Sequence, residues 1–267
     1  MKSSKGFTLI ELLVVIAVIA ILMAILMPAL QLAKKKAAGI VCSSRQKQLT
    51  LAWVMYADDN DDKIVNSDTY KASGDRRYWV EPPQTEDGTQ VGIGTMTLVD
   101  RKRGIEKGAL FPYINSVDFY HCPSDDRQRF EETSSQCAFR SYSITSGLNS
   151  DWAVAGGGAD HIAYKNRSDI KNPSVALVFV EEAEKEQGFN HHSWALWVQR
   201  PEFYDPLAVF HGESCTLGFA DGHARSYRFR TKAVLDEFRA GTKTLRVDRT
   251  NDDYRFFKEH FPYKSLQ

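Results

Sequence analysis

The residues best suited to chemistry lie in the last third of the chain. His211 is followed after nine residues by Asp221 and Gly222. Imidazole and carboxylate groups serve as metal ligands and as general acids and bases. One interpretation is structural: Asp221 and Gly222 make a turn, and His211 hydrogen-bonds the backbone where the chain enters a sheet. The other interpretation is a divalent metal site, whose candidate ligands are His211, His223 and either Glu181 or Glu182.

Catalysis by this region lacks an identifiable nucleophile. The sequence contains no Gly-x-Ser-x-Gly element, and no cysteine stands beside a histidine in a recognisable catalytic motif. It also lacks a phosphate-binding loop, a Cys-x-x-Cys pair and a dinucleotide fingerprint. We therefore expect no enzymatic activity. The alternative is that the chain is a membrane-tethered enzyme with His211 as general base. That mechanism requires a second titratable group in the same pocket.

A short acidic run offers oxygen ligands for calcium. Asp58, Asn60 and Asp62 have the alternating spacing with which a calcium-binding loop begins. Lys63 and Thr69 occupy the positions at which an EF-hand needs a glycine and a bidentate glutamate, so an EF-hand is excluded. A looser calcium site stays open as an alternative to a solvated loop that ends a helix.

Four cysteines suggest disulfides if the domain is exported: Cys42, Cys122, Cys137 and Cys215. They allow three pairings, and the residues alone do not choose among them. Four free buried thiols are the alternative.

Composition limits the classes of partner. The 267 residues include 34 basic and 34 acidic side chains, so the formal net charge is zero. That balance provides no broad basic surface for nucleic acid. The length allows one large domain or two small ones beyond a membrane segment. We expect no nucleic-acid partner and no resident cofactor, apart from the calcium considered above.

A long helix must position several of these residues. No charge interrupts residues 12–33, which are enough to span a bilayer. Beyond Pro28, which should bend the helix, Leu49, Ala52, Trp53 and Tyr56 recur with the spacing of one helical face. A helix over residues 7–57 would be about 75 Å long at about 1.5 Å per residue, and the acidic run should end it.

The rest of the chain predicts short strands and a few short helices, as in an α+β domain. An Asp-Gly pair between alternating apolar residues is a strong hairpin signal and predicts a type I′ turn within residues 211–229. Further strands are expected at 140–144, 175–180 and 193–198, brief strands at 78–80 and 95–99, a short helix or turn at 108–113 and a helix at 233–239.

The N-terminus resembles the prepilin signature of type IV pilins and type II secretion pseudopilins. The matching residues are Gly6, Phe7, Thr8-Leu9-Ile10-Glu11 and Pro28. The resemblance implies cleavage after Gly6 by a prepilin peptidase, methylation of the new amine of Phe7, and assembly of the mature helices into a filament. In that filament Glu11 would neutralise the amine of a neighbouring subunit. An ordinary signal peptide or signal anchor is the alternative, although neither gives Glu11 a role.

The spacing of His211 and Asp221-Gly222 resembles the H-X9-DG element of a large group of bacterial prepilin-like proteins. Both resemblances imply an α+β, pilin-like fold in which a long N-terminal helix, half in the membrane and half amphipathic, packs against an antiparallel sheet. The implied divisions are a leader at 1–6, a helix at 7–57 with its membrane half at 7–30, and a head at 58–267. Because the sheet packs on the helix in such proteins, the resemblance favours pairing Cys42 with Cys122.

We therefore expect a structural subunit of a type IV pilus or a type II secretion-type filament. Its implied partners are the peptidase and methyltransferase, other pilin subunits and an inner-membrane assembly platform. It would cross the bacterial inner membrane once, with its N-terminus cytoplasmic and its head periplasmic or extracellular, although the basic residues 34–36 favour the opposite orientation. The alternative is a membrane-tethered domain that binds glycan or another surface ligand through Trp194 or Trp197.

Overall fold

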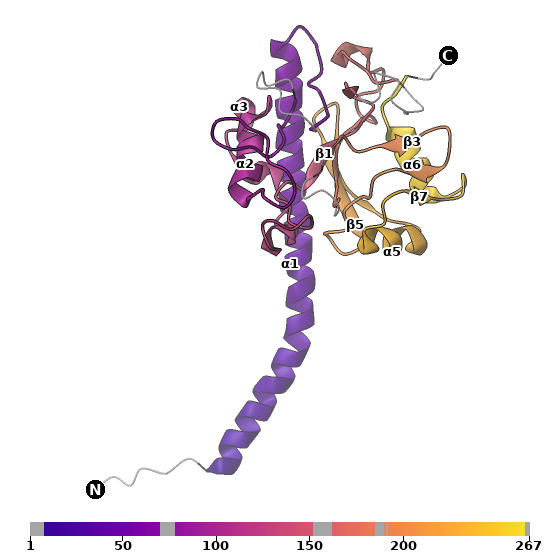
Figure 1. Cartoon of the computed structure of the whole chain (residues 1–267). Coiled ribbons are helices and arrows are strands. Elements are labelled where there is room, and N and C mark those ends of the chain that lie inside the picture. The colour runs from indigo at the N-terminus through magenta and orange to yellow at the C-terminus, as the bar shows by residue number, and fades with distance from the viewer. Residues whose placement is uncertain (1–7, 70–77, 152–161, 185–189, 191, 265–267) are drawn as a thin grey trace. The chain divides into compact units, whose positions relative to one another are not determined.

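The computed structural model describes residues 8–69, 78–151, 162–184, 190 and 192–264 (Figure 1). The chain divides into two compact units, residues 1–37 and 38–267. Helix α1 (Leu9–Asp59) contributes to both units. The predicted leader, with Gly6 and Phe7, lies outside the described residues. The helix ends two residues beyond the predicted boundary, within the acidic run.

The part of α1 in the first unit is apolar and exposed. Its most apolar 18-residue window has a mean hydropathy of 3.2, and none of that window is buried. By length and composition, α1 is the one helix in the described part of the chain that could cross a membrane. It continues without interruption through Pro28, so the proline does not end the helix, and the bend stays a prediction.

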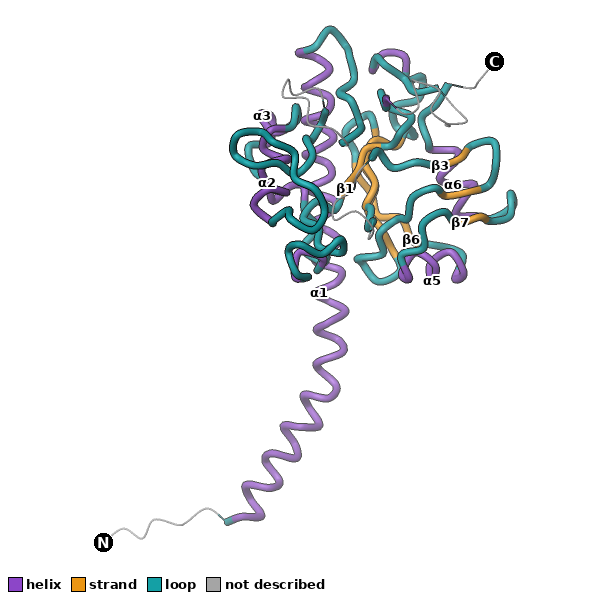
Figure 2. The backbone as a smooth tube through the Cα atoms, in the orientation of Figure 1, coloured by secondary structure: helices purple, strands orange, loops and turns teal. Residues whose placement is uncertain are grey.

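Two antiparallel sheets organise the second unit (Figure 2). The larger sheet has the order β1-β2-β5-β6, and the smaller sheet has the order β3-β4-β7. The larger is formed by β1 (Tyr142–Ile144), β2 (Leu177–Glu181), β5 (Ser214–Phe219) and β6 (Ala224–Arg228). The smaller is formed by β3 (Leu196–Trp197), β4 (Glu202–Phe203) and β7 (Leu245–Arg246). The prediction of an α+β fold with a long helix and antiparallel sheets is confirmed.

Within the described residues, the helices outside α1 are short. They are α2 (Leu98–Lys107), α3 (Phe111–Ile114), α5 (Lys232–Ala240) and α6 (Asp252–His260), with the 3-10 helices η1 (Val117–Tyr120), η2 (Arg127–Arg129) and η3 (Arg167–Asp169). Two of the four had not been predicted as helices. Residues 95–99 were expected to form a brief strand. Instead Thr97 caps α2 in a capping box with Asp100, because each side chain accepts a hydrogen bond from the other's backbone amide. Helix α6, which begins after Asn251, lies in a part of the chain for which no helix was predicted.

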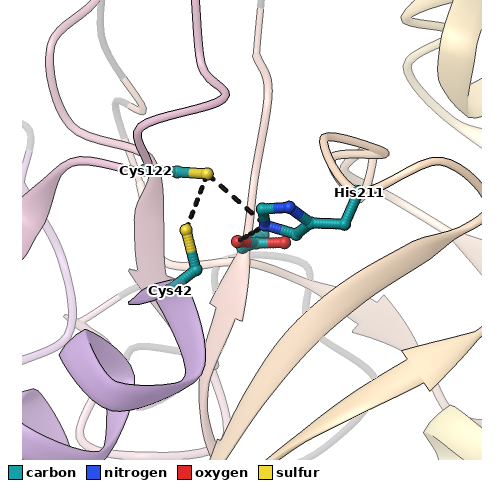
Figure 3. A group of neighbouring side chains, drawn as sticks. Cys42, Cys122 and His211 are labelled. Carbon is teal, nitrogen blue, oxygen red and sulfur yellow. Dashed lines mark hydrogen bonds and ion pairs between the residues drawn. The ribbon is translucent and has the colours of Figure 1, made fainter. Parts of the chain in front are cut away.

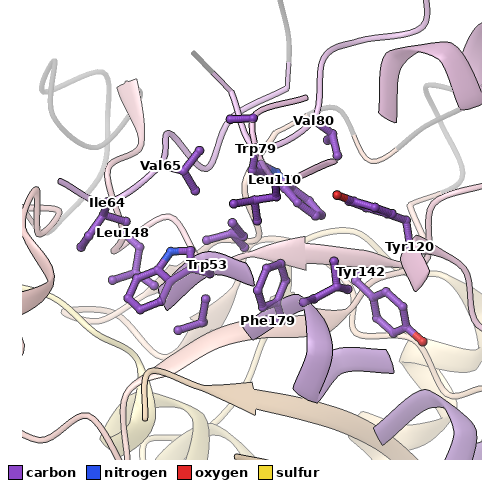
Figure 4. Packing of buried hydrophobic residues seen from close by; sticks show 14 of the residues in the cluster. Trp53, Ile64, Val65, Trp79, Val80, Leu110, Tyr120, Tyr142, Leu148 and Phe179 are labelled. Atoms are coloured by element: carbon purple, nitrogen blue, oxygen red, sulfur yellow. The ribbon is translucent and has the colours of Figure 1, made fainter. Parts of the chain in front are cut away.

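The larger sheet separates two hydrophobic cores. One core joins α1 to β1 and β2 through residues that include Trp53, Tyr142 and Phe179 (Figure 4). The other joins the sheet to α5, α6 and the smaller sheet through residues that include Leu217, Phe238 and Phe257. The head therefore has helix α1 on one side of the sheet and α5 and α6 on the other.

The second half of α1 lies directly on strand β5. Of the predicted apolar stripe, Leu49, Ala52 and Trp53 are buried. On the same face the Gln46 side chain donates a hydrogen bond of 2.8 Å to the carbonyl of Thr216. Gly218 permits the close approach, since a Cβ there would lie 2.6 Å from Thr50 Oγ1. The amphipathic half of the helix is therefore part of the head's core.

The hairpin β5–β6 was predicted correctly, but its turn type was not. The Gly222 amide donates to the Phe219 carbonyl, and the Phe219 amide donates to the His223 carbonyl. Gly222 has a φ of 94°, whereas Asp221 is not among the residues with positive φ. A type I′ turn needs positive φ at both central residues. The loop is therefore a three-residue connection in which Gly222 takes the left-handed position.

Candidate functional site

Four side chains from distant parts of the sequence converge inside the head. They are Cys42, Cys122, Glu181 and His211, and one ligand atom from each lies within 4.8 Å of all the others (Figure 3). The two sulfurs are 2.8 Å apart, and Cys122 Sγ is 3.4 Å from His211 Nε2. The same Nε2 lies 3.0 Å from Glu181 Oε1. We refer to these four residues as the Cys-His-Glu cluster.

The cluster is closed to solvent. Cys42, Cys122 and Glu181 have 0% of their surface exposed, and the side chain of His211 is 5% exposed. A substrate therefore cannot reach these groups unless the head opens. The arrangement suits a structural role in which the groups bind one another or a small ion.

Helix α1 positions Cys42. This residue lies one helical turn before Gln46 on the face that packs on the sheet. The backbone of Gly39, on the same helix, faces the imidazole: a Cβ there would lie 3.5 Å from His211 Cγ. A Cβ at position 39 would therefore be in ordinary van der Waals contact with the ring, so the imidazole packs directly on this part of α1.

A buried polar network positions Cys122. Its amide donates to Ser141 Oγ at 2.9 Å, and the Ser141 hydroxyl donates to Asp125 Oδ2 at 2.6 Å. Asp125 in turn forms an ion pair with Arg127, whose NH2 group lies 2.7 Å from Oδ2. The guanidinium also donates to the backbone carbonyls of Arg140, Glu182 and Glu184. The turn that follows Cys122 is thus fixed to β1 and to the end of β2.

The other half of the cluster comes from the larger sheet. Glu181 ends β2, and its Oε2 accepts a 2.9 Å hydrogen bond from the Thr216 amide of β5. His211 precedes β5, and Gly212 follows it with a φ of 77°, a left-handed conformation suited to glycine. The chain reverses there, and the His211 amide donates to the Ser214 carbonyl. This local turn places the imidazole at the side of the sheet that faces α1.

The electrostatics of the cluster favour a thiolate beside a protonated imidazole. The hydrogen bond with Cys122 lowers the pKa of Cys42 to about 7, against the effect of burial. Burial raises the pKa of Cys122. Burial alone would lower the pKa of His211, but hydrogen bonds to Cys42 and Glu181 outweigh it and raise that pKa to about 10. The thiolate is the form of cysteine that binds metals and exchanges with disulfides.

The cluster differs from both interpretations of His211 made from the sequence. Its side chain bonds Glu181 and Cys122 instead of backbone, so the structural interpretation was wrong for the imidazole. Of the ligands considered for a metal, His211 and Glu181 are together, whereas His223 bonds Asp221 at the hairpin turn. Glu182 is buried elsewhere. The two cysteines were considered for disulfides alone and were missed as possible ligands.

The favoured cysteine pair is together, but as thiols. Cys42, Cys122, Cys137 and Cys215 are all free and buried, and a disulfide would need sulfurs about 2.05 Å apart. Cys137 lies outside the cluster, and Cys215 belongs to the core on the other side of the sheet.

The calcium candidates have partners within the protein. Asp58 Oδ1 is 2.6 Å from a guanidinium nitrogen of Arg167, and Asp62 accepts from the Ser168 amide at 3.0 Å. The Asn60 amide donates to the Tyr56 carbonyl at 2.7 Å and caps the end of α1. Asp58 and Asp62 thus fix the end of the helix to residues 167–168, while Asn60 bonds within the helix end. Calcium binding there stays a prediction.

The aromatic residues proposed for a glycan groove are placed differently. Trp194 is fully buried, and its indole nitrogen donates to the Asp205 carbonyl. Trp197 is partly exposed, and the guanidinium of Arg200 lies 3.9 Å from the centre of its ring. The prediction that Trp194 contacts a surface ligand is therefore wrong.

At the start of α1, Glu11 has a local partner. Its Oε2 accepts hydrogen bonds of 2.8 Å from both the amide and the hydroxyl of Thr8, while the Glu11 amide donates to Thr8 Oγ1 at 3.3 Å. Thr8 and Glu11 thus form a capping box. The Thr-x-x-Glu spacing could have predicted it. A role for Glu11 in assembly must be separated experimentally from this role in capping.

Comparison with known proteins places this N-terminal segment. Residues 1–27 match the family described as the prokaryotic N-terminal methylation motif. The chain is 46% identical over 66 residues to the type IV wide pilus major component PilA4 of Thermus thermophilus. That match spans 25% of this chain and half the length of the relative. No solved structure matches the chain. The chain therefore has a prepilin-type N-terminal methylation motif and is pilin-like in its long N-terminal helix and α+β fold.

Proposed function

We propose that the chain is the precursor of a structural subunit of a type IV pilus or a related secretion filament. A prepilin peptidase would cleave after Gly6, and the new amine of Phe7 would be methylated. The observation that carries the proposal is the methylation motif at residues 1–27, continued by a helix whose first half is apolar and exposed. Such a surface needs lipid or other apolar helices around it. A membrane before assembly and a filament core afterwards would each cover it.

Glu11 would then set the register between subunits. Burying an ionised carboxylate in hydrocarbon costs on the order of 2.5–3.5 kcal/mol. The two hydrogen bonds from Thr8 satisfy acceptor positions but leave the charge. The amine of a neighbouring chain would neutralise this charge. The register that brings the amine to Glu11 is therefore favoured over registers that leave the charge unpaired.

A first experiment tests processing. The N-terminus of the protein from native membranes is identified by mass spectrometry. We expect a chain that begins with methylated Phe7. An intact Met1, or cleavage beyond residue 20, would contradict the proposal and leave an anchor or a signal peptide.

A second experiment separates charge from capping at Glu11. Glutamine also serves at this position of a capping box, so Glu11→Gln removes the charge and keeps the cap. Thr8→Ala, the matched control, removes the cap and keeps the charge. We expect Glu11→Gln to be inserted and cleaved normally but not to form filaments, and Thr8→Ala to assemble. Assembly of Glu11→Gln at the wild-type level would refute the role of the charge.

The head is compatible with a structural subunit. Its cysteines, histidine and glutamate are enclosed, which gives no support to the tethered-enzyme alternative. The binding-domain alternative keeps Trp197 as its remaining aromatic candidate. The inner-membrane location, the cytoplasmic N-terminus, the assembly platform and the kinship with H-X9-DG proteins belong to this proposal.

A further inference from the structure

We propose that the Cys-His-Glu cluster binds one thiophilic divalent metal ion, Zn²⁺ by its chemistry, and that this ion fastens helix α1 to the head. Two sulfurs, one imidazole nitrogen and one carboxylate oxygen form the kind of ligand set that zinc takes in proteins. Calcium and magnesium prefer oxygen ligands, so the thiols argue against them. The inference does not depend on the proposed assembly into filaments.

The distances suit a tetrahedral site. Metal–ligand bonds of about 2.0–2.3 Å place tetrahedral ligands about 3.3–3.8 Å from one another. The separation of 3.4 Å between Cys122 Sγ and His211 Nε2, and that of 3.0 Å between Nε2 and Glu181 Oε1, are within a few tenths of an ångström of these values. The two sulfurs, 2.8 Å apart, must separate by about 1 Å. Each of them ends a side chain that can rotate about one bond.

Charge provides a second reason for a cation. Glu181 is fully buried and is paired with His211 Nε2, so when that nitrogen binds an ion the buried carboxylate needs another cation, which the ion supplies. In the metal-bound form the imidazole is neutral, both thiols lose their protons to solvent, and the ion is attracted to three anionic groups. Hydrogen bonds from the Thr216 amide to Glu181, and from the Cys122 amide to Ser141, already orient two of the ligands.

The positions of the ligands define the ion's role. Cys42 lies on α1, whereas Cys122, Glu181 and His211 lie on three separate segments of the head. A disulfide between the cysteines would join two of these segments and leave Glu181 and His211 paired with each other. A four-ligand site joins all four segments. Because no position is open to substrate, the site would be structural instead of catalytic.

The test uses the full chain, purified in detergent with its thiols reduced and dialysed against a limiting concentration of Zn²⁺. We expect about one zinc per chain by elemental mass spectrometry. Cys122→Ser and His211→Ala should each weaken binding more than about tenfold. The matched controls are Cys137→Ala, a buried thiol outside the cluster, and His223→Ala, an exposed histidine. Both should bind zinc like the wild type.

If the cluster variants do not fold, Co²⁺ binding to the wild-type chain tests whether the cysteines hold a metal. Co²⁺ added to the wild-type chain should give an intense near-ultraviolet thiolate-to-metal band, which added Zn²⁺ removes. Absence of this band, or zinc retained equally by the cluster variants, would overturn the proposal. A Cys42–Cys122 disulfide in protein isolated without reductant, together with no metal binding after reduction, would overturn it too and assign the cysteines to a covalent link.

Discussion

Gly218→Ala tests whether the second half of α1 rests directly on the sheet. A Cβ at this position of β5 would lie 2.6 Å from Thr50 Oγ1 and 3.7 Å from the Gln46 carbonyl oxygen. Ordinary contacts are about 3.5–4.0 Å, so the first approach is too short by about 0.9 Å. Thr50 is fully buried, and its hydroxyl donates to the Gln46 carbonyl at 2.7 Å. Because a β-branched side chain has few rotamers, the helix or the strand must move. We expect a loss of about 1–3 kcal/mol in the free energy of unfolding.

Thr50→Ala provides the compensating change. It removes the hydroxyl that the new methyl group at position 218 would meet, and it loses a hydrogen bond with a net contribution of about 0.5–1.5 kcal/mol. If the overlap causes the loss, the double variant should be more stable than the sum of the two single variants predicts, by about 1 kcal/mol or more. A favourable coupling energy between the two substitutions would show that positions 218 and 50 are in direct contact. A single variant cannot show this.

The assay is urea unfolding of the full chain in detergent, followed by tryptophan fluorescence. Trp53, buried on the same face of α1, contributes to this signal together with the chain's four other tryptophans, so the signal follows unfolding of the head. The control is Gly92→Ala, where a Cβ would meet no atom within 4 Å and φ is not positive. We expect that control to stay within about 0.5 kcal/mol of the wild type. A Gly218→Ala chain as stable as the control, or additive changes in the double variant, would refute direct packing of the helix on β5.

Two further predictions concern buried charges in the head. Arg127→Met leaves the carboxylate of Asp125 buried without its ion pair, so we expect the free energy of unfolding to fall by about 3–5 kcal/mol. The control is Arg228→Met, at an exposed ion pair, which should lower the free energy of unfolding by less than about 1 kcal/mol in the same urea assay. Burial and repulsion by Glu184 raise the pKa of Asp205 to about 7. Since the folded state then holds a proton that the unfolded state releases near pH 4, the contribution of Asp205 to stability is lost as the pH rises from about 4 to about 7. Asp205→Asn should reduce that loss, by up to about 1.4 kcal/mol per pH unit, and parallel stability profiles of variant and wild type would contradict the assignment.

The long helix and the hairpin could be predicted because their signals are local. Hydrophobic periodicity located α1, and the acidic residues beyond it marked its end within two residues. An Asp-Gly pair located the turn between β5 and β6. The type of turn could not be read, since three-residue and two-residue loops both place glycine at a left-handed position. Helix α2 was missed because the β-branched residues before it outweighed the Thr97–Asp100 capping box.

The Cys-His-Glu cluster was only half predictable. His211 and Glu181 were both among the candidate ligands of the metal-site alternative, and the structure places them 3.0 Å apart. Cys42 and His211 are 169 positions apart, and no spacing rule relates a helix face to a loop at that separation. What brings them together is the packing of α1 on β5, where Gly218 permits a close approach to Thr50. The effect of Gly218 appears once the three-dimensional contacts are known.

Glu11 and Glu181 are both carboxylates in surroundings that disfavour a negative charge. The two sites differ in the source of the cation that is proposed to neutralise the charge. Glu11 stands in an apolar helix, where the hydrogen bonds from Thr8 leave its charge in place. Glu181 is enclosed in the head, where His211 and the Thr216 amide hold it. The cation proposed for Glu11 belongs to another chain, so Glu11→Gln should change assembly and leave the stability of the isolated chain unaltered. The cation proposed for Glu181 is an ion bound within one chain, so Glu181→Gln should lower zinc content and stability before any neighbour is present. A Glu11→Gln chain with normal zinc content and no filaments, together with a Glu181→Gln chain that has lost zinc, would therefore support both assignments, because each effect is confined to one site.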